Sequence, residues 1–347
     1  MHEKELLNWL RGYDGPPLRL MEVCGTHTSS LYRTGLKQLL PKKITMLSGP
    51  GCPVCVTPSA YIDKLVEYSL QPDCTVLSFG DMLAVPGSSL SLAQAKARGG
   101  SVDFFYTPED VLQKAKQNPG RQYIVAAVGF ETTAPVWATV ILQAQKEKIT
   151  NVRFLTALKT MPVALSSLCE QGDIDGFLCP GHVAVITGTE AYKALGEKYH
   201  KTMVVGGFSG PQLLMALVRL ALECSRGSYG LWNEYPSVVC QEGNVQALEL
   251  LQRIYCPGNA TWRGLGMLPD SGLYLREEFS SWDAGSYGLD KDVPPPGCQC
   301  GKVLLGKLLP QQCPLFGKLC TPEHPVGACM VSSEGTCCIT YREGENI

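Results

Sequence analysis

The stretch Leu18-Arg-Leu-Met-Glu-Val-Cys-Gly-Thr-His27 sets the pattern that most of the chain then follows. It begins with a short run of β type, Leu18–Val23, which predicts a strand. It continues into a glycine-containing turn that carries a thiol and an imidazole, Cys24 and His27. The stretch therefore predicts a strand with reactive side chains just beyond its end.

Seven further β-type runs follow, separated by stretches of helical character. The runs are Ile44–Leu47, Thr75–Phe79, Val102–Tyr106, Tyr123–Val128, Val152–Ala157, Gly176–Leu178 and Met203–Val205. Spacings of about 20–30 residues from strand to strand fit βα units, and runs without polar alternation indicate strands buried in a parallel sheet. Grouping four strands and then four predicts two similar α/β lobes, residues 1–119 and 120–235, each with a mainly parallel sheet flanked by helices.

Reactive side chains recur in the turns after these strands. They are Cys52, Cys55, Asp81, Glu131, Lys159, Cys179 and His182. Because ligands bind outside the carboxyl ends of strands in open parallel sheets, we expect the two lobes to face each other across a cleft lined by these turns. Taken singly, Asp81, Glu131 and Lys159 are better explained as caps or surface ion pairs.

The third region, residues 236–347, is rich in Gly, Pro and Cys and holds seven cysteines between Cys298 and Cys338. Thiolates are soft ligands that suit iron–sulfur clusters and zinc. Structural zinc usually takes paired C-x2–4-C knuckles, which this region lacks, and the wide spacings favour a [4Fe–4S] cluster over zinc and zinc over disulfides. The expected ligands are Cys298, Cys313, Cys320 and Cys337, with Cys300 and Cys329 as substitutes.

The pair Cys52-Pro-Val-Cys55 follows a strand and predicts a reversible dithiol, with its first sulfur at a helix N-terminus that lowers a thiol pKa. The alternative is half of a zinc site. Cys24 with His27 is able to bind a transition metal, or His27 lowers the pKa of Cys24 for nucleophilic attack. A buried thiol beside a satisfied histidine is the ordinary alternative.

Composition limits the class of protein. The 347 residues are 45% apolar and 18% charged, and the net charge of −2 gives no reason to expect nucleic acid or an anionic membrane as partner. The N-terminus has no apolar run typical of a signal peptide, and no apolar stretch is long enough to span a bilayer. We therefore expect a cytoplasmic monomer that forms heterocomplexes, in which 16 cysteines indicate metal ligation or redox chemistry.

Together these motifs resemble the HypD family of hydrogenase maturation factors. The matching segments run in order along the chain: Glu22–His27, Gly49–Cys55, Phe79–Met82, Val85–Gly87, Gly129–Thr133, Cys179–His182, Glu242–Asn244, Cys313–Pro322 and Met330–Gly335. Departures are mild. Ala328 stands where the family pattern has proline, and Ser209-Gly210 replaces an acidic-Pro turn. Neither departure falls on an expected ligand.

The resemblance implies a scaffold with redox steps that assembles the Fe(CN)2CO group of [NiFe]-hydrogenases. It implies that Cys24 holds the iron together with a cysteine of a small HypC-type partner, and that a HypE-type partner supplies cyanide. Cys52 and Cys55 would be a redox pair linked to the [4Fe–4S] cluster, and Glu131, His27 and His182 would supply protons or hydrogen bonds. Competing readings are an iron–sulfur-dependent thiol–disulfide reductase and a zinc-stabilised interaction protein.

Overall fold

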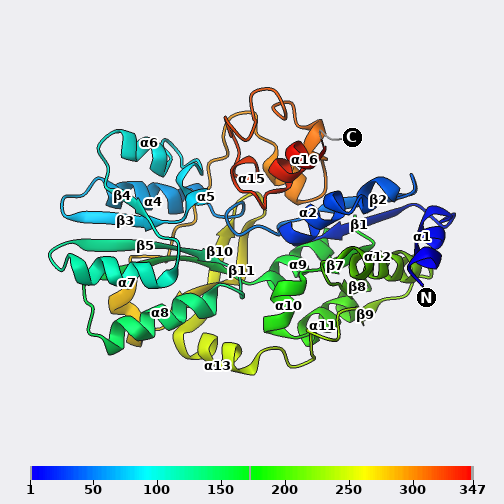
Figure 1. Cartoon of the computed structure of the whole chain (residues 1–347), viewed down its shortest axis with the longest axis horizontal. Coiled ribbons are helices and arrows are strands. Elements are labelled where there is room, and N and C mark those ends of the chain that lie inside the picture. Colours follow the sequence, from blue (N-terminus) through cyan, green and yellow to red (C-terminus); the bar gives the residue numbers. More distant parts are fainter. Residues whose placement is uncertain (1, 172, 345–347) are drawn as a thin grey trace.

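The computed structural model describes residues 2–171 and 173–344 and contains two sheets flanked by helices (Figure 1). The first sheet has the order β2-β1-β7-β8-β9, and all its neighbouring strands are parallel. Its strands are β1 (Leu18–Glu22), β2 (Ile44–Ser48), β7 (Gly176–Cys179), β8 (Thr202–Val205) and β9 (Gly230–Asn233). The predicted α/β fold with mainly parallel sheets is confirmed.

The second sheet has the order β10-β11-β6-β5-β3-β4. Its strands are β3 (Cys74–Ser78), β4 (Val102–Phe104), β5 (Gln122–Gly129), β6 (Val152–Lys159), β10 (Tyr255–Trp262) and β11 (Gly266–Leu275). Strands β3 to β6 pair in parallel, whereas β11 pairs antiparallel with both β6 and β10. This antiparallel hairpin lies in residues 236–347, for which the sequence predicted no strand.

The predicted grouping of strands into sheets is wrong. The chain leaves the first sheet after β2, builds β3 to β6 of the second sheet, and returns to the first sheet at β7. The boundary predicted at residues 119 and 120 therefore falls between β4 and β5, which belong to one sheet. Consecutive strands usually lie side by side. Buried parallel strands of similar composition carry no local signal for the three crossings between the sheets, after β2, β6 and β9, that break this rule here.

Helices flank both sheets (Figure 1). They are α1 (Glu3–Arg11), α2 (Gly25–Arg33), α3 (Leu36–Leu39), α4 (Ser59–Ser69), α5 (Gly80–Leu83), α6 (Leu92–Ala97), α7 (Pro108–Gln117), α8 (Ala134–Lys146), α9 (Met161–Glu170), α10 (Gly181–Thr187), α11 (Glu190–Tyr199), α12 (Gly210–Ser225) and α13 (Val245–Ile254). One buried cluster joins side chains of both sheets, for example Met21 of β1 and Val76 of β3. The two sheets therefore share a central core.

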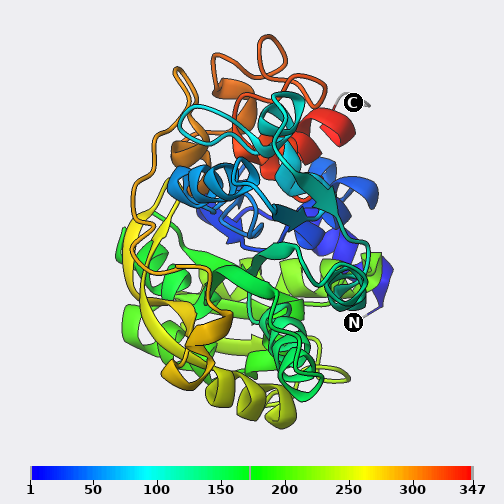
Figure 2. The ribbon, with the colours of Figure 1, turned by 90° about the vertical axis from the view of Figure 1, so that its left-hand side faces the viewer.

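The C-terminal segment sits on top of the junction between the two sheets (Figures 1 and 2). Its regular elements are short: α14 (Cys300–Leu304), the 3-10 turn Pro310–Gln312, α15 (Ala328–Val331) and α16 (Thr336–Gly344), after an earlier 3-10 turn at Glu277–Trp282. Helix α16 packs on α2, where the Tyr32 hydroxyl lies 3.3 Å from that of Thr340 and Arg33 pairs with Glu343 at 3.2 Å. Within the described ranges, no helix combines the length and the apolar character needed to cross a membrane.

Candidate functional site

A cavity of about 170 Å³ lies where the carboxyl ends of strands from both sheets meet. Its walls come from the turns after β1, β2, β5 and β7 and from one residue of the C-terminal segment. The lining residues are Val23, Cys24, Gly25, Thr26, Gly51, Pro53, Phe130, Thr132, Thr133, Pro180, His182, Val183 and Glu334. Of the predicted site residues, Cys24 and His182 line this cavity.

Cys24 caps the N-terminus of α2. Burial raises the pKa of its thiol to about 12, although hydrogen bonds from the backbone of His27 and from Thr26 act in the opposite direction. The free side chain is thus a neutral thiol at neutral pH. A thiolate at this position requires a compensating positive charge, which is what a bound metal ion supplies.

Glu22, in the last position of β1, holds Cys24 in place and was missed by the sequence reasoning. Its side chain is buried, with Oε2 accepting from the Cys24 backbone N–H at 2.9 Å and Oε1 accepting from the Thr28 hydroxyl at 2.5 Å. One carboxylate therefore ties the end of β1 to the first turn of α2. The available signal was an acidic side chain between the apolar residues Met21 and Val23 in the β-type run Leu18–Val23.

The two predicted histidines stack on opposite sides of one phenyl ring. Ring centroids are 4.5 Å apart for His27 and Phe208 and 4.0 Å apart for His182 and Phe208. His182 is exposed and lines the cavity. His27 is fully buried behind it, where burial lowers its pKa to about 4, and its Nε2 pairs with the Gly206 carbonyl at 3.2 Å. His27 is therefore a neutral packing partner that does not line the cavity.

The Cys52–Cys55 turn passes directly beside Cys24. A Cβ atom on Gly51 would lie only 2.4 Å from the Cys24 nitrogen, so only glycine permits this approach. Both Cys52 and Cys55 are buried, and the Cys55 N–H points at the Cys52 sulfur at 3.3 Å. The prediction that the pair opens a helix is wrong, because the pair lies in a turn and α4 begins only after Pro58.

Five cysteines form a continuous line of neighbouring thiols, here called the sulfur row: Cys52, Cys55, Cys329, Cys300 and Cys298. The Cys55 thiol interacts with those of Cys52 and Cys329. The Cys300 and Cys329 sulfurs are 2.6 Å apart, and Cys300 also interacts with Cys298. The row therefore runs from the turn beside Cys24 into the C-terminal segment.

Six of the seven C-terminal cysteines line one apolar cavity: Cys298, Cys300, Cys313, Cys320, Cys329 and Cys337. The four expected cluster ligands and both substitutes are thus brought together, whereas Cys338 lies outside. Across residues 2–171 and 173–344, no group of three or more His, Cys, Asp or Glu side chains converges on a position for a single metal ion. The ligands of a [4Fe–4S] cluster bind separate irons, and a ring of thiols is the donor set that such a cluster uses.

Comparison with known proteins identifies the family. A family model described as HypD, hydrogenase formation hypA family, matches residues 4–344. The chain belongs to the HypD family. The hydrogenase maturation factor HypD of Escherichia coli K12 is 41% identical over 332 residues, which cover 94% of this chain and 89% of the relative. That of Rhodobacter capsulatus is 39% identical over 338 residues, covering 94% and 90%. A putative hydrogenase expression/formation protein of Methanocaldococcus jannaschii is 37% identical over 332 residues, covering 94% and 92%.

The segments that resemble the HypD family supply most of the cavity around Cys24. Its walls include residues of Glu22–His27, Gly49–Cys55, Gly129–Thr133 and Cys179–His182. The segment Phe79–Met82, which also resembles the family, binds the C-terminal segment. Its Asp81 carboxylate accepts from the Ser332 hydroxyl at 2.9 Å and from the Ser333 N–H at 3.3 Å. Asp81 is therefore a structural link at this edge.

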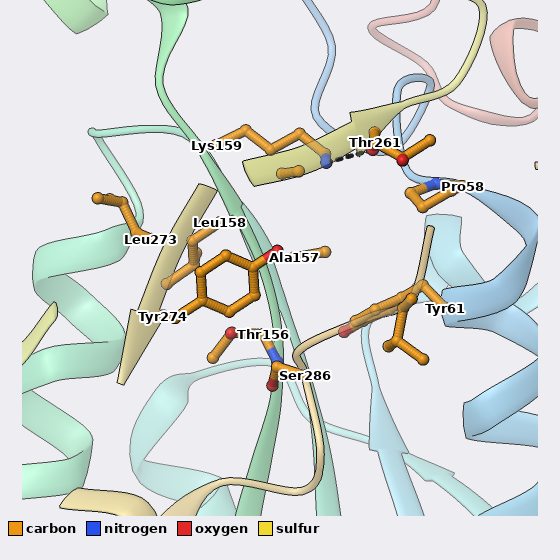
Figure 3. Close-up of a pocket in the computed structure, with 12 residues that line it drawn as sticks. Pro58, Tyr61, Thr156, Ala157, Leu158, Lys159, Thr261, Leu273, Tyr274 and Ser286 are labelled. Carbon is orange, nitrogen blue, oxygen red and sulfur yellow. Dashed lines mark hydrogen bonds between the residues drawn. The ribbon is translucent and has the colours of Figure 1, made fainter. Parts of the chain in front are cut away.

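Lys159 lies away from Cys24, in a separate small cavity that also contacts Tyr61, Thr156 and Ser286 (Figure 3). Its buried ammonium donates to the Thr261 carbonyl at 2.7 Å and lies 5.4 Å from the Trp262 ring centroid. Burial lowers the pKa of this lysine to about 7. The structure thus does not bring Lys159 together with the other predicted residues.

Glu131 lies behind the cavity wall. Its Oε1 accepts from the Met161 N–H at 2.9 Å, while its buried Oε2 has no hydrogen-bond partner among the described residues. Burial raises the pKa of this carboxyl to about 7. Glu131 is therefore able to hold a proton close to neutral pH, although it does not itself line the Cys24 cavity.

This burial predicts a specific dependence of stability on pH. The unfolded chain loses the Glu131 proton near its ordinary pKa of 4.5, whereas the folded chain keeps it until about pH 7. The folded state binds more protons in this window, so stability present below pH 4.5 is lost as the pH rises through 7. Glu131→Gln is expected to remove this loss, on the order of 3 kcal/mol.

Urea unfolding at about pH 5 and about pH 8 measures the effect as a change in the free energy of unfolding. Glu197→Gln, on an exposed part of α11, is the control. Its free energy of unfolding should change between the two pH values as much as that of the wild type. If the Glu131→Gln protein and the wild type lose the same stability between these pH values, the carboxyl is not protonated in the folded state as described.

Proposed function

We propose that this chain is a hydrogenase maturation factor that holds the iron of the Fe(CN)2CO group at Cys24 during assembly. The observation that carries the proposal is the placement of Cys24 in a cavity where turns of both sheets meet, next to the Cys52–Cys55 pair. Membership of the HypD family and the maturation role named for its relatives support it. The iron with its cyanide and carbon monoxide ligands is cargo.

The chain's own residues would prepare Cys24 for this cargo. Glu22 fixes its backbone, and the N-terminus of α2 directs N–H groups towards its sulfur. Because burial disfavours the free thiolate, loss of the thiol proton would accompany iron binding. His182 and Glu334, both exposed at the cavity, are placed to contact an arriving protein. We infer that a HypC-type partner shares the iron through its own cysteine and that a HypE-type partner donates cyanide.

The C-terminal thiols fit a [4Fe–4S] cluster held by Cys298, Cys313, Cys320 and Cys337, which line one cavity. Such a cluster supplies single electrons. Cys300 and Cys329, expected as substitute ligands, are better explained as the middle of the sulfur row, because their sulfurs face each other at 2.6 Å. Two one-electron reductions, with uptake of two protons, would convert a Cys300–Cys329 disulfide into two thiols. Thiol–disulfide exchange from Cys329 to Cys55 would then reduce a Cys52–Cys55 disulfide and re-form the Cys300–Cys329 disulfide, in a cytoplasm that keeps such thiols reduced.

The alternative function is an iron–sulfur-dependent thiol–disulfide reductase. The sulfur row favours it, since the row connects a C-terminal thiol site with a buried dithiol. The reductase function gives no role to the Cys24 cavity or to the Glu22 carboxylate that positions Cys24. The two functions therefore differ in whether Cys24 is required.

Cys24→Ala is expected to abolish hydrogenase maturation while sparing the redox chemistry. The test supplies this chain to a hydrogenase-producing bacterium that lacks its own HypD and measures hydrogenase activity. Infrared spectra of the protein purified from these cells show whether cyanide and carbon monoxide stretching bands are present. The wild type should restore activity and carry the bands, and the alanine variant should do neither.

Cys240→Ala serves as the matched control, because Cys240 is an exposed cysteine outside both cavities. It should behave as the wild type does. Full maturation by the Cys24→Ala protein would exclude Cys24 as the iron ligand and favour the reductase.

A further inference from the structure

Arg263 follows β10 directly and is held against the Cys52–Cys55 turn. Its side chain is only 4% exposed. Its backbone N–H donates to the Val56 carbonyl at 2.8 Å, and its Nη2 donates to the Pro86 carbonyl at 2.9 Å. These contacts hold the guanidinium group in the interior beside the sulfur row. A guanidinium group stays protonated in proteins.

On its other side, the Arg263 segment contacts the start of α14. A Cβ atom on Gly264 would lie 2.6 Å from the Gly301 Cα, so the two backbones touch at these glycines. Cys300 is the first residue of α14. Arg263 also lines a cavity of about 280 Å³ together with Cys298 and Cys300. The guanidinium therefore lies beside the end of the sulfur row that meets the proposed cluster.

The positive charge of Arg263 is only partly compensated. Its Nη1 is buried without a hydrogen-bond partner among the described residues. Its Nε lies 3.3 Å from Asp292 Oδ1, the same oxygen that accepts the Ser59 N–H at 3.0 Å. The buried Lys159 ammonium is attracted first by Asp290 and then by this Asp292 carboxylate. One carboxylate is thus shared between two cations and a backbone donor, and a buried cation in this setting favours negative charge on its neighbours.

We propose that Arg263 is a positioning residue that sets the reduction potential of the cluster in the C-terminal segment. The inference rests on the proposed function, which places that cluster on Cys298 and its partners. An electron from an external one-electron donor lowers the charge of a [4Fe–4S] cluster from +2 to +1, with no other bond made or broken. A fixed cation close to a ligand sulfur stabilises the added charge, and cluster potentials depend on such nearby charge.

The proposal predicts shifts of opposite sign for two variants. Arg263→Met removes the cation and should lower the equilibrium constant for reduction at least tenfold, which corresponds to about 59 mV for one electron. Asp292→Asn keeps an acceptor for the Ser59 N–H but removes the opposing charge, so it should raise the potential. Lys302→Met is the control: Lys302 lines the same cavity but is exposed, and its charge is screened by water.

The experiment measures iron and sulfide content first and then the midpoint potential, by titration with dithionite followed by electron paramagnetic resonance. Absence of a cluster from the wild type would refute the proposed [4Fe–4S] site, and the inference about Arg263 would fall with it. If the cluster is present, unchanged potentials in Arg263→Met and Asp292→Asn overturn the inference. If Arg263→Met fails to fold or to hold the cluster, the test rests on Asp292→Asn alone. A higher midpoint potential in that variant supports the inference, and an unchanged midpoint potential overturns it.

Discussion

Replacing Cys300 with alanine is expected to leave iron and sulfide in the protein while stopping the reduction of a Cys52–Cys55 disulfide. Cys300 is the only thiol that interacts with both Cys298 and Cys329 in the sulfur row. Its removal interrupts the row, because thiol–disulfide exchange requires direct contact between sulfurs. We expect the reduction rate to fall by more than about a hundredfold, because Cys329 loses the thiol that lies 2.6 Å from its sulfur.

The measurement adds dithionite anaerobically to protein with an oxidised Cys52–Cys55 pair. Two electrons and two protons convert the disulfide into two thiols, which are then counted by maleimide labelling and mass spectrometry. Cys338→Ala is the control, because Cys338 is a buried C-terminal cysteine that does not line the thiol cavity. Reduction at the wild-type rate in Cys300→Ala would refute the relay, and loss of the cluster would make Cys300 a ligand.

The second large effect is expected for Gly51→Ala. The added methyl group would lie 2.4 Å from the Cys24 nitrogen, 2.6 Å from its Cα and 2.7 Å from the Val23 carbonyl carbon. All three contacts are backbone atoms, so no side-chain rotation relieves them. The turn must move away from Cys24, which we expect to cost about 2 kcal/mol or more of the free energy of unfolding and to prevent retention of the iron fragment.

Urea unfolding and the infrared bands of the bound fragment measure the two effects separately. Gly80→Ala is the matched control, since a Cβ atom there meets nothing within 4 Å and Gly80 also follows a strand of the same junction. It should keep the wild-type stability and the bands. Wild-type behaviour of Gly51→Ala would mean that the Cys52–Cys55 turn does not press against Cys24.

Strands β1 to β8 and the chemistry of their turns were predictable from the sequence because both are local, whereas β9, β10 and β11 were not predicted. Buried runs such as Tyr123–Val128 mark strands, and thiols and imidazoles mark the turns that follow. The partners of the strands were not predictable. Nothing in the residues of β7 indicates that it pairs with β1 across more than 150 positions and not with its predecessor β6.

The site shows the same division between local and long-range information. Cys24, Cys52, Cys55 and the C-terminal cysteines stand out by residue type. Glu22 and Arg263 do not, because their importance comes from contacts: a carboxylate on the Cys24 backbone and a guanidinium beside a cavity of thiols. The contact between Cys300 and Cys329 likewise joins residues of two short helices whose packing depends on the whole C-terminal segment.

The most direct test of the account is the iron and acid-labile sulfide content of anaerobically purified protein, with an electron paramagnetic resonance spectrum. It compares the wild type with a Cys313→Ala/Cys320→Ala variant, which removes two of the thiols that line the C-terminal cavity. The account predicts about four irons and four sulfides per chain in the wild type and their loss in the variant. Zinc in the wild type, no metal at all, or a cluster that survives both substitutions would contradict it.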